Sequence, residues 1–333
     1  MDNKTFPERV KGVKGNLFDK IPESKFKNWL WWQYMKGTWP ALIQELLDIH
    51  LDGFWRDKGL FCAQIGEMRF YGGHTTEYDR RAYRFLREDI KKKIPLRYFG
   101  VVTDIITRYK YPQAVPIAPL YPQRHRLGFS WHHTETISDM SITPEEKLLL
   151  TERFRIKPND IILDVGAYIG FGSMGMARHL EGEGRLIAFE CNPEILKVMS
   201  RNLENNRKSH ILLVPKAAWR DSNGTTFGFH NEAQARSLTE GEVAQKVPTT
   251  TIDSMVESLK LPKVDFVSLS INGAELEALE GMQMTLKEFH PNLSIPGWVY
   301  RKGHPLWQDV IPKLERYGYT TWVGKRGRII AWV

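Results

Sequence analysis

A short apolar segment that ends in an aspartate and a glycine-rich turn constrains the fold of this chain more than any other feature. Residues 161–163 are Ile-Ile-Leu, and Asp164 follows directly. The next six residues, Val-Gly-Ala-Tyr-Ile-Gly, lead into a segment with helical character that runs to Leu180. A buried strand that passes through glycines into a helix is the opening unit of a nucleotide-binding α/β fold.

A second short strand, which ends in Glu190, supports this interpretation. Residues 185–190 read Arg-Leu-Ile-Ala-Phe-Glu, and an acid at this place can accept hydrogen bonds from a ribose diol. Gly166 and Gly170 let the backbone approach a ligand closely, and the helix that follows them offers free N–H groups. No Gly-Lys-Ser/Thr follows the turn, which excludes a Walker loop. The Asp-x-Gly-x-x-x-Gly spacing also differs from Gly-x-Gly-x-x-Gly.

Three motifs, taken in order and spacing, resemble the FkbM-type class I S-adenosyl-L-methionine (SAM) methyltransferases. They are residues 164–170, residues 189–193 (Phe-Glu-Cys-Asn-Pro) and residues 264–275. The resemblance covers about residues 150–333. It implies an α/β, Rossmann-like domain with a seven-stranded, mostly parallel sheet that ends in an antiparallel hairpin, and SAM as cofactor.

The resemblance also implies where the cofactor binds. Asp164, Gly166 and Gly170 would surround the methionyl part of SAM, and Glu190 would bind the ribose. Trp219 lies at the end of the third expected strand, where it either stacks on the adenine or packs in the core. The predicted cofactor-binding residues are Asp164, Gly166, Ala167, Tyr168, Gly170, Glu190, Asn192, Ala218 and Trp219.

The fourth expected strand departs from the family at the acceptor side. The family reads roughly Lys-Ile-Asp-Val-Glu-Gly-Ala-Glu, whereas residues 268–275 read Ser-Leu-Ser-Ile-Asn-Gly-Ala-Glu. Ser270 is a poor ligand for a hard cation, so we predict no metal. Ser270, Asn272 and His304 are the predicted acceptor-side residues, with His304 as the candidate base. Glu275, in the first turn of a helix, would favour the helix dipole.

Three functions follow from these observations. The first is SAM-dependent O-methylation of a hydroxyl on a sugar or a glycosylated small molecule, as the resemblance implies. The second is a binding or scaffold protein that keeps the fold and lacks turnover, because the acceptor-side acids are replaced. The third is a nucleic-acid methyltransferase, which would bind its acceptor through a basic N-terminal part. The sequence does not indicate an oligomeric state.

The N-terminal part, residues 1–140, is basic, rich in aromatics and expected to be mainly helical. It holds 23 Lys and Arg against 16 Asp and Glu, an excess that suits nucleic acid or an anionic glycan. The excess equally suits the solvated face of an ordinary helical domain, because it is modest. Apolar residues recur at helical spacing after Pro40 and again from Pro95 to Tyr109. A proline-rich linker near residues 111–123 leads to the domain expected at residues 141–333.

Other classes of protein are disfavoured. The first residues lack the apolar segment of a signal peptide, and no stretch approaches the roughly 20 apolar residues of a membrane span, so a cytoplasmic location is expected. Cys62 and Cys191 are far apart and form neither a disulfide framework nor a zinc site. His125, His132 and His133 are close to Glu135, but a hydrogen-bonded loop explains them better than a metal site does.

Overall fold

The computed structural model describes residues 39–72, 80, 83–84, 86–112, 114–117, 136–206, 210–229, 235–236, 244–301, 303–324 and 327–333. The histidines near residue 130 and much of the proline-rich segment lie outside these ranges. Within them, no helix is both long and apolar enough to cross a membrane.

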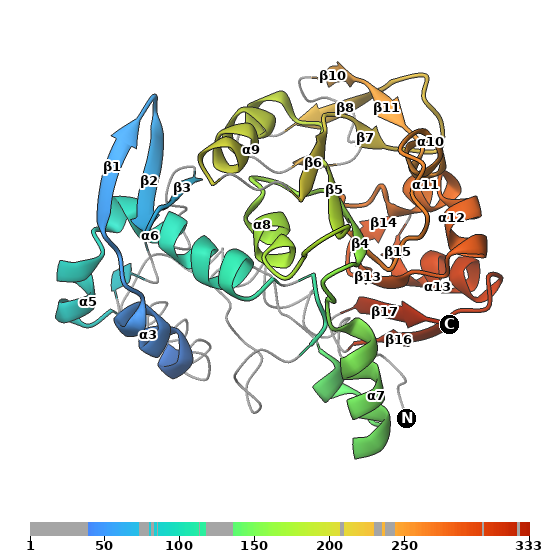
Figure 1. The fold of residues 1–333 in the computed structure, drawn as a ribbon, viewed down its shortest axis with the longest axis horizontal. Coiled ribbons are helices and arrows are strands. Elements are labelled where there is room, and N and C mark those ends of the chain that lie inside the picture. Colours follow the sequence, from blue (N-terminus) through green and yellow to red (C-terminus); the bar gives the residue numbers. More distant parts are fainter. Residues whose placement is uncertain are drawn as a thin grey trace.

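A seven-stranded sheet forms the centre of the C-terminal part (Figure 1). Five of its strands are parallel, and the last two in the chain are antiparallel to their neighbours. In order across the sheet, the strands are β16 (Thr320–Val323), β17 (Arg328–Trp332), β13 (Asn292–Pro296), β12 (Phe266–Leu269), β4 (Ile161–Val165), β5 (Arg185–Phe189) and β6 (Ile211–Val214). The predicted mostly parallel, Rossmann-like sheet with its terminal hairpin is therefore confirmed.

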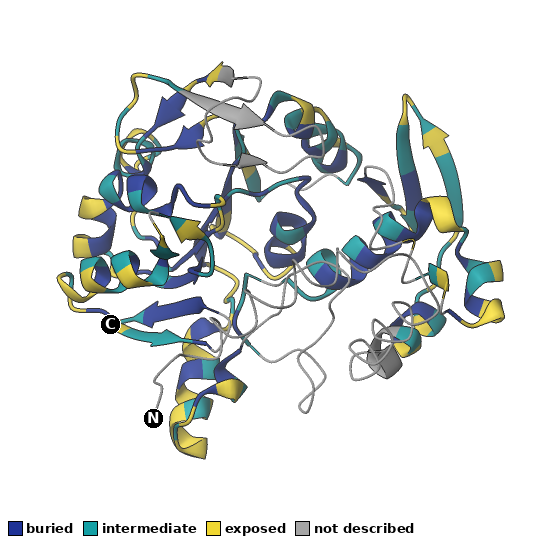
Figure 2. Cartoon of the chain, turned by 180° about the vertical axis from the view of Figure 1, so that it is seen from behind, coloured by how far each residue is buried: buried dark blue, intermediate teal, exposed yellow. Residues whose placement is uncertain are grey.

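Helices cover both faces of this sheet because its strands are apolar on both sides. Along β4, Leu163 packs with the helices of one face and Ile162 with those of the other. The first face carries α10 (Ile252–Ser258), α11 (Glu275–Glu280), α12 (Gln283–Glu288) and α13 (Trp307–Glu315). The second carries α7 (Pro144–Phe154), α8 (Phe171–Ala177) and α9 (Pro193–Asn205). Figure 2 shows the resulting buried sheet between half-exposed helices.

Short strands surround the carboxyl ends of the main sheet. β7 (Ala217–Ala218) pairs in parallel with β11 (Thr249–Thr250). β8 (Thr225–Phe229) lies between β9 (Ala235–Arg236) and β10 (Ala244–Val247), and β14 (Tyr300–Arg301) pairs with β15 (His304–Pro305).

The N-terminal part combines helices with a small sheet. Its helical elements are α3 (Trp39–Asp48), α5 (Glu88–Lys93), α6 (Leu96–Asp104) and a π-helical segment, Ile105–Lys110, and a 3-10 turn, Ile137–Asp139, precedes α7. The helices expected after Pro40 and from Pro95 are present. The strands β1 (Gly53–Asp57), β2 (Leu60–Ile65) and β3 (Met68–Gly72) form an antiparallel sheet that the expectation of a mainly helical part did not include.

Asparagines of α9 bind the free edge of this small sheet. The side chain of Asn202, which is fully buried, accepts from Tyr71 N (2.7 Å) and donates to Tyr71 O (2.9 Å). One helical turn later, Asn206 accepts from Arg69 N (2.9 Å) and donates to Arg69 O (2.8 Å). Two residues along a strand and four residues along a helix span similar lengths. The two side-chain amides, four residues apart, can therefore pair with two backbone positions of β3 that are two residues apart, as a neighbouring strand would.

One apolar cluster joins the N-terminal part to the methyltransferase-like part. Phe70 of β3 packs edge-on against Phe171 of α8, with ring centroids 5.3 Å apart, and both belong to a cluster that also contains Phe99 and Ile195. Gly175 allows the approach of the π-helical segment, because a Cβ there would lie 2.3 Å from Tyr109 O. The division near residue 140 stays a prediction, and this cluster extends across it.

Candidate active site

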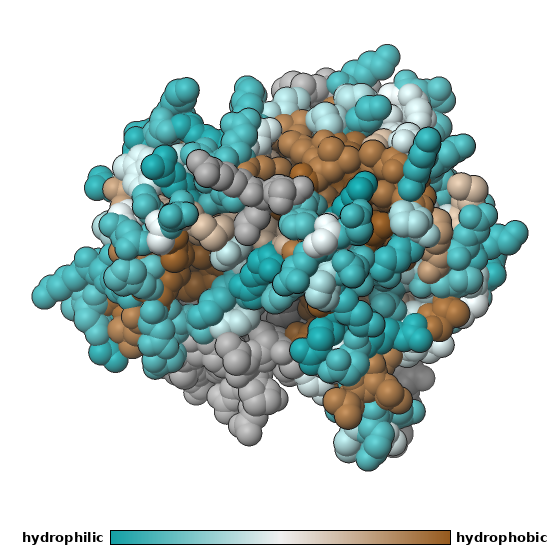
Figure 3. Space-filling view, in the orientation of Figure 1, coloured by the Kyte–Doolittle hydropathy of each residue, from teal (hydrophilic) through white to brown (hydrophobic). Residues whose placement is uncertain are grey.

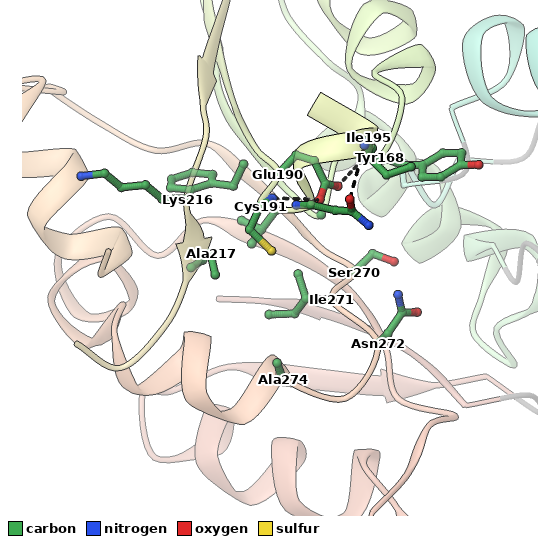
Figure 4. Close-up of a pocket in the computed structure, with 15 residues that line it drawn as sticks. Tyr168, Glu190, Cys191, Ile195, Lys216, Ala217, Ser270, Ile271, Asn272 and Ala274 are labelled. Atoms are coloured by element: carbon green, nitrogen blue, oxygen red, sulfur yellow. Dashed lines mark hydrogen bonds between the residues drawn. The ribbon is translucent and has the colours of Figure 1, made fainter. Parts of the chain in front are cut away.

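A cleft opens at the carboxyl ends of β4, β5 and β12 (Figure 4). Ligands of open α/β sheets bind at this edge, outside the ends of the strands. Its walls come from the turn after β4, the residues after β5 and β6, and the turn after β12. The space-filling view shows hydrophobic surface exposed in the same upper part of the molecule, between hydrophilic residues (Figure 3).

The turn after β4 approaches the end of β12 closely. Gly166 has a φ of 88°, and a Cβ on it would lie 2.1 Å from Ser270 O. The N–H groups of Gly166 and Ala167 both donate to Phe189 O, at 3.0 and 2.9 Å. Only glycine fits both the left-handed backbone and the contact with Ser270. This turn therefore brings the ends of three strands together around one space.

Glu190 is held at the mouth of the cleft by the backbone. One carboxylate oxygen accepts from Cys191 N (2.8 Å) and Asn192 N (2.9 Å), and the other accepts from Tyr168 N (3.0 Å). Burial raises the pKa of Glu190, and the three N–H donors act in the opposite direction. A carboxylate has about four acceptor positions, so this one retains capacity for a hydroxyl donor.

The wall opposite Glu190 is apolar. It is formed by short side chains after β6 and at the start of α11, with one isoleucine from the turn after β12: Ala217, Ala218, Ala274 and Ile271. Ile195 of α9 adds a further apolar side chain to the cleft, on the side of Glu190. A flat, apolar wall beside a carboxylate fits an adenosine, because the base is planar and its ribose carries two hydroxyl donors. The residues present thus fit the SAM that the sequence implies.

The turn after β12 supplies polar groups to the same cleft. Ser270 and Asn272 both line it, and Asn272 adopts a left-handed backbone with a φ of 55°. Glu275 is fully buried below this turn and accepts from Ile271 N (3.1 Å) and Gly273 N (2.7 Å). Glu275 therefore fixes the conformation that presents Asn272, a more specific role than support of a helix dipole.

Glu275 makes the free energy of unfolding depend on pH. Its carboxyl titrates near 4.5 in an unfolded chain, whereas burial raises its pKa to about 7 in the folded protein. Between these values the folded state binds more protons than the unfolded state. The contribution to stability therefore falls as the pH rises from 4.5 to 7, by about 3 kcal/mol in total. Urea unfolding at several pH values should show this slope.

The matched variant for this prediction is Glu275→Gln. Glutamine cannot titrate, so position 275 of the variant adds no pH dependence to the free energy of unfolding, and its NH₂ group would face a backbone N–H, which lowers the stability of the variant. The difference between wild type and variant should shrink as the pH rises, because Asp164 and Glu190 titrate in both proteins. Parallel pH profiles would show that Glu275 is ionised throughout the range.

Asp164 does not line the cleft. Its carboxylate is buried and accepts from Ser173 Oγ of α8 at 2.6 Å, and Ser268 of β12 also donates to it. Burial raises the pKa of Asp164, and the two hydroxyls oppose this shift. In this structure the acid links β4, α8 and β12 and so shapes the turn, and its contact with the methionyl part of SAM stays a prediction.

Four other predicted site residues lie away from the cleft walls. Ala167 and Gly170 belong to the turn after β4, where Gly170 begins α8 with a φ of 85°. Trp219 is buried with Ala217, Val247 and Ala274, which favours packing over stacking on an adenine. His304 of β15 pairs with Asp309 Oδ2 at 2.8 Å.

The cleft is lined by five of the predicted cofactor residues and by two of the predicted acceptor-side residues. They are Gly166, Tyr168, Glu190, Asn192 and Ala218, together with Ser270 and Asn272. The other cleft residues were not predicted: Val165, Phe189, Cys191, Ile195, Lys216, Ala217, Ile271 and Ala274. All eight lie within three residues of a predicted site residue, so extending each motif by a few residues would have found them.

Comparisons with known proteins agree with this geometry. Residues 164–321 match the methyltransferase FkbM domain. The hexuronic acid methyltransferase AglP of Haloferax volcanii is 28% identical over 144 residues, which make up 42% of this chain and 56% of that protein. The chain thus spans about half the length of this curated relative.

Solved structures of methyltransferases resemble the chain as well. A methyltransferase FkbM from Methylobacillus flagellatus has a TM-score of 0.41 at 16% identity and covers 76% of this chain and 70% of its own. Aeropyrum pernix fibrillarin with bound SAM has a TM-score of 0.35 at 11% identity and covers 86% of this chain and 100% of its own. The motifs and the strand order agree with the match, so residues 164–321 form a domain of the methyltransferase FkbM type, with SAM as cofactor.

Proposed function

We propose that the chain transfers a methyl group from SAM to a hydroxyl group of a sugar or of a glycosylated small molecule. The observation that carries the proposal is the backbone-held Glu190 carboxylate, which faces an apolar wall at the sheet edge where this family binds SAM. The sugar acceptor is supported by the curated relative, which is named for its action on a hexuronic acid.

On the cofactor side, the chain binds and orients. Glu190 accepts hydrogen bonds from the ribose hydroxyls, and Ala217, Ala218 and Ala274 cover the base. Gly166 keeps the turn after β4 close to β12, so that the reacting groups meet at one place. When bound, SAM would supply a methyl group whose leaving group is a neutral thioether, S-adenosylhomocysteine, while the proton of the methylated hydroxyl passes to solvent water; such a transfer depends mainly on positioning.

On the acceptor side, Ser270 and Asn272 orient the hydroxyl that is methylated. A serine hydroxyl both donates and accepts, and an asparagine amide offers both kinds of group, which suits a neutral sugar hydroxyl. We assign no base to His304, because its side chain is engaged with Asp309 and lies away from the cleft walls.

Transfer of a labelled methyl group tests the proposal. The full chain is incubated with methyl-labelled SAM and either a panel of neutral and acidic glycosides or nucleic acid, and products are identified by mass spectrometry. We expect a methyl ether on a sugar, with turnover reduced in Ser270→Ala and Asn272→Ala. Label in nucleic acid and in no sugar would favour the alternative that rests on the basic charge of residues 1–140. SAM binding without any transfer would favour the scaffold function.

Glu190→Ala is expected to weaken SAM binding roughly 10- to 100-fold, because it removes hydrogen bonds to a charged acceptor. Calorimetric titration with SAM measures this change, and circular dichroism checks that the variant is folded. The control is Glu194→Ala, since Glu194 is exposed on α9 and its side chain pairs with Lys197 at the surface. Equal affinities in both variants would leave Glu190 a structural residue.

A further inference from the structure

Tyr168 combines an unusual backbone with a place in the cleft. Its φ is 55°, a left-handed conformation that a bulky side chain rarely adopts. Its N–H donates to Glu190, and the residue lines the cleft. Strained residues of this kind gather at ligand sites, where the surroundings hold them in place. Contacts with neighbouring residues therefore hold Tyr168 in this conformation. One of these neighbours belongs to the N-terminal part of the chain.

That neighbour is Arg108 of the π-helical segment. Its guanidinium carbon lies 5.0 Å from the centroid of the Tyr168 ring. Its Nε donates to Asp104 Oδ1 at 2.9 Å, and the side chain is 24% exposed. The segment is fixed against α8 by the close approach at Gly175, and π-helical turns recur at functional sites. Asp104 and Tyr168 thus hold the side chain of Arg108, and α8 fixes its backbone, before any ligand binds.

The guanidinium of Arg108 keeps free hydrogen-bond donors. Only Nε has a hydrogen-bond partner among the residues that the structure describes, and that partner is Asp104. The two terminal nitrogens together carry four N–H groups, in the planar arrangement that binds a carboxylate or a phosphate with two parallel hydrogen bonds. The Tyr168 ring, the Ser270 hydroxyl and the Asn272 amide extend to the same side of the cleft, away from Lys216 (Figure 4).

From this geometry we propose that Arg108 and Tyr168 form a subsite for an anionic group of the acceptor, a carboxylate or a phosphate on the sugar. The inference rests on the proposed function and deepens it by naming the acceptor class. Arg108 binds the anion, the Tyr168 ring supports the guanidinium, and Ser270 and Asn272 orient the hydroxyl that is methylated. The N-terminal part thereby contributes to the choice of acceptor.

Three acceptors distinguish the sources of the anion. Methyl glucuronoside carries a carboxylate, glucose 1-phosphate carries a phosphate, and methyl glucoside is neutral. We expect wild type to prefer one of the two anionic sugars. In Arg108→Gln, kcat/KM for that sugar should fall roughly 10- to 100-fold, mostly through KM, as expected for the loss of a charge-assisted pair. The neutral sugar should change little, and Arg108→Lys should restore part of the loss.

Arg97→Gln is the matched control, because Arg97 of α6 also lies over a tyrosine ring, 5.1 Å from the centroid of Tyr98, and does not line the cleft. Equal losses on all three sugars in Arg108→Gln would overturn the proposal, and so would methylation of all three sugars at one rate by wild type.

A second measurement separates this inference from the proposed function. Inorganic phosphate and glucuronate are titrated into wild type and Arg108→Gln, both saturated with S-adenosylhomocysteine, and the response is followed by NMR. If wild type binds either anion and Arg108→Gln does not, the anion subsite is supported, whether or not any sugar is methylated. A lack of methylation would then reject the proposed function and leave the subsite standing. No difference between the two proteins would reject the subsite, even if neutral sugars are methylated.

Discussion

Gly166→Ala is expected to lower the free energy of unfolding by about 4 kcal/mol and to abolish measurable SAM binding. The added Cβ would lie 2.1 Å from Ser270 O and 2.9 Å from Ser270 C, both of which are backbone atoms. The residue would also have to keep a φ of 88°. To relieve the overlap, the turn after β4 must move away from β12, and the cleft between them widens. Urea unfolding and calorimetric titration with SAM measure the two effects.

Gly172→Ala provides the control for this prediction. A Cβ at Gly172, in the first turn of α8, would have no atom within 4 Å. Alanine is a better helix former than glycine, so this variant should keep its affinity for SAM, and its free energy of unfolding should rise by up to about 1 kcal/mol. If the two alanine variants behaved alike, the close approach at Gly166 would not be what holds the turn.

Asn202→Ala is expected to lower the free energy of unfolding by roughly 3 kcal/mol or more, because it leaves buried backbone groups unpaired. The Asn202 side chain serves the N–H and the C=O of Tyr71, and it also donates to Ile169 O in the turn after β4 at 2.8 Å. We therefore expect weaker SAM binding as well, although Asn202 lies outside the cleft. Amide hydrogen exchange at Tyr71 should rise more than exchange within β4.

Asn205→Ala is the control on the same helix. Asn205 is partly buried, and among the described residues its amide bonds to Arg201 O alone, within α9. Its loss should change stability by less than about 1 kcal/mol. If Asn202→Ala lowered the free energy of unfolding as little as Asn205→Ala, the small N-terminal sheet would not be stabilised by α9. The domain boundary predicted near residue 140 would then gain support.

The central sheet could be predicted from the sequence because its signals are local. Each apolar run ends at a polar residue or a turn, as β4 does at Asp164 and the residues that follow, and helices of clear periodicity separate the runs. Asn192 followed by Pro193 predicts the start of α9, and in the structure the Asn192 side chain accepts a hydrogen bond from Glu194 N. The number of strands and their mostly parallel arrangement then followed from the resemblance.

The small sheet β1–β3 was missed because its strands show little alternation. In β2 the central residues Cys62 and Ala63 are both buried and the flanking residues are half-buried, so one face does not stand out. The turns carried a signal that was not used. Lys58-Gly59 and Gly66 have positive φ values, and glycines between two apolar runs favour a hairpin.

The candidate site was predicted in position and only partly in detail. Glu190 was predicted at the cleft from its place at a strand end. Asp164 stands at the same kind of place, and its side chain points to Ser173, a contact between residues nine apart that a motif does not specify. His304 was chosen by residue type, and its side chain instead pairs with Asp309. Arg108 escaped notice because its contact with Tyr168 joins segments that are far apart in the sequence.

Calorimetric titration of the full chain with SAM and with S-adenosylhomocysteine tests the central claim most directly. We expect both compounds to bind at one site per chain with micromolar affinity, about −8 kcal/mol, and Glu190→Ala to weaken the binding of both. No heat with either compound, from protein shown to be folded, would contradict the claim that the cleft beside Glu190 holds the cofactor.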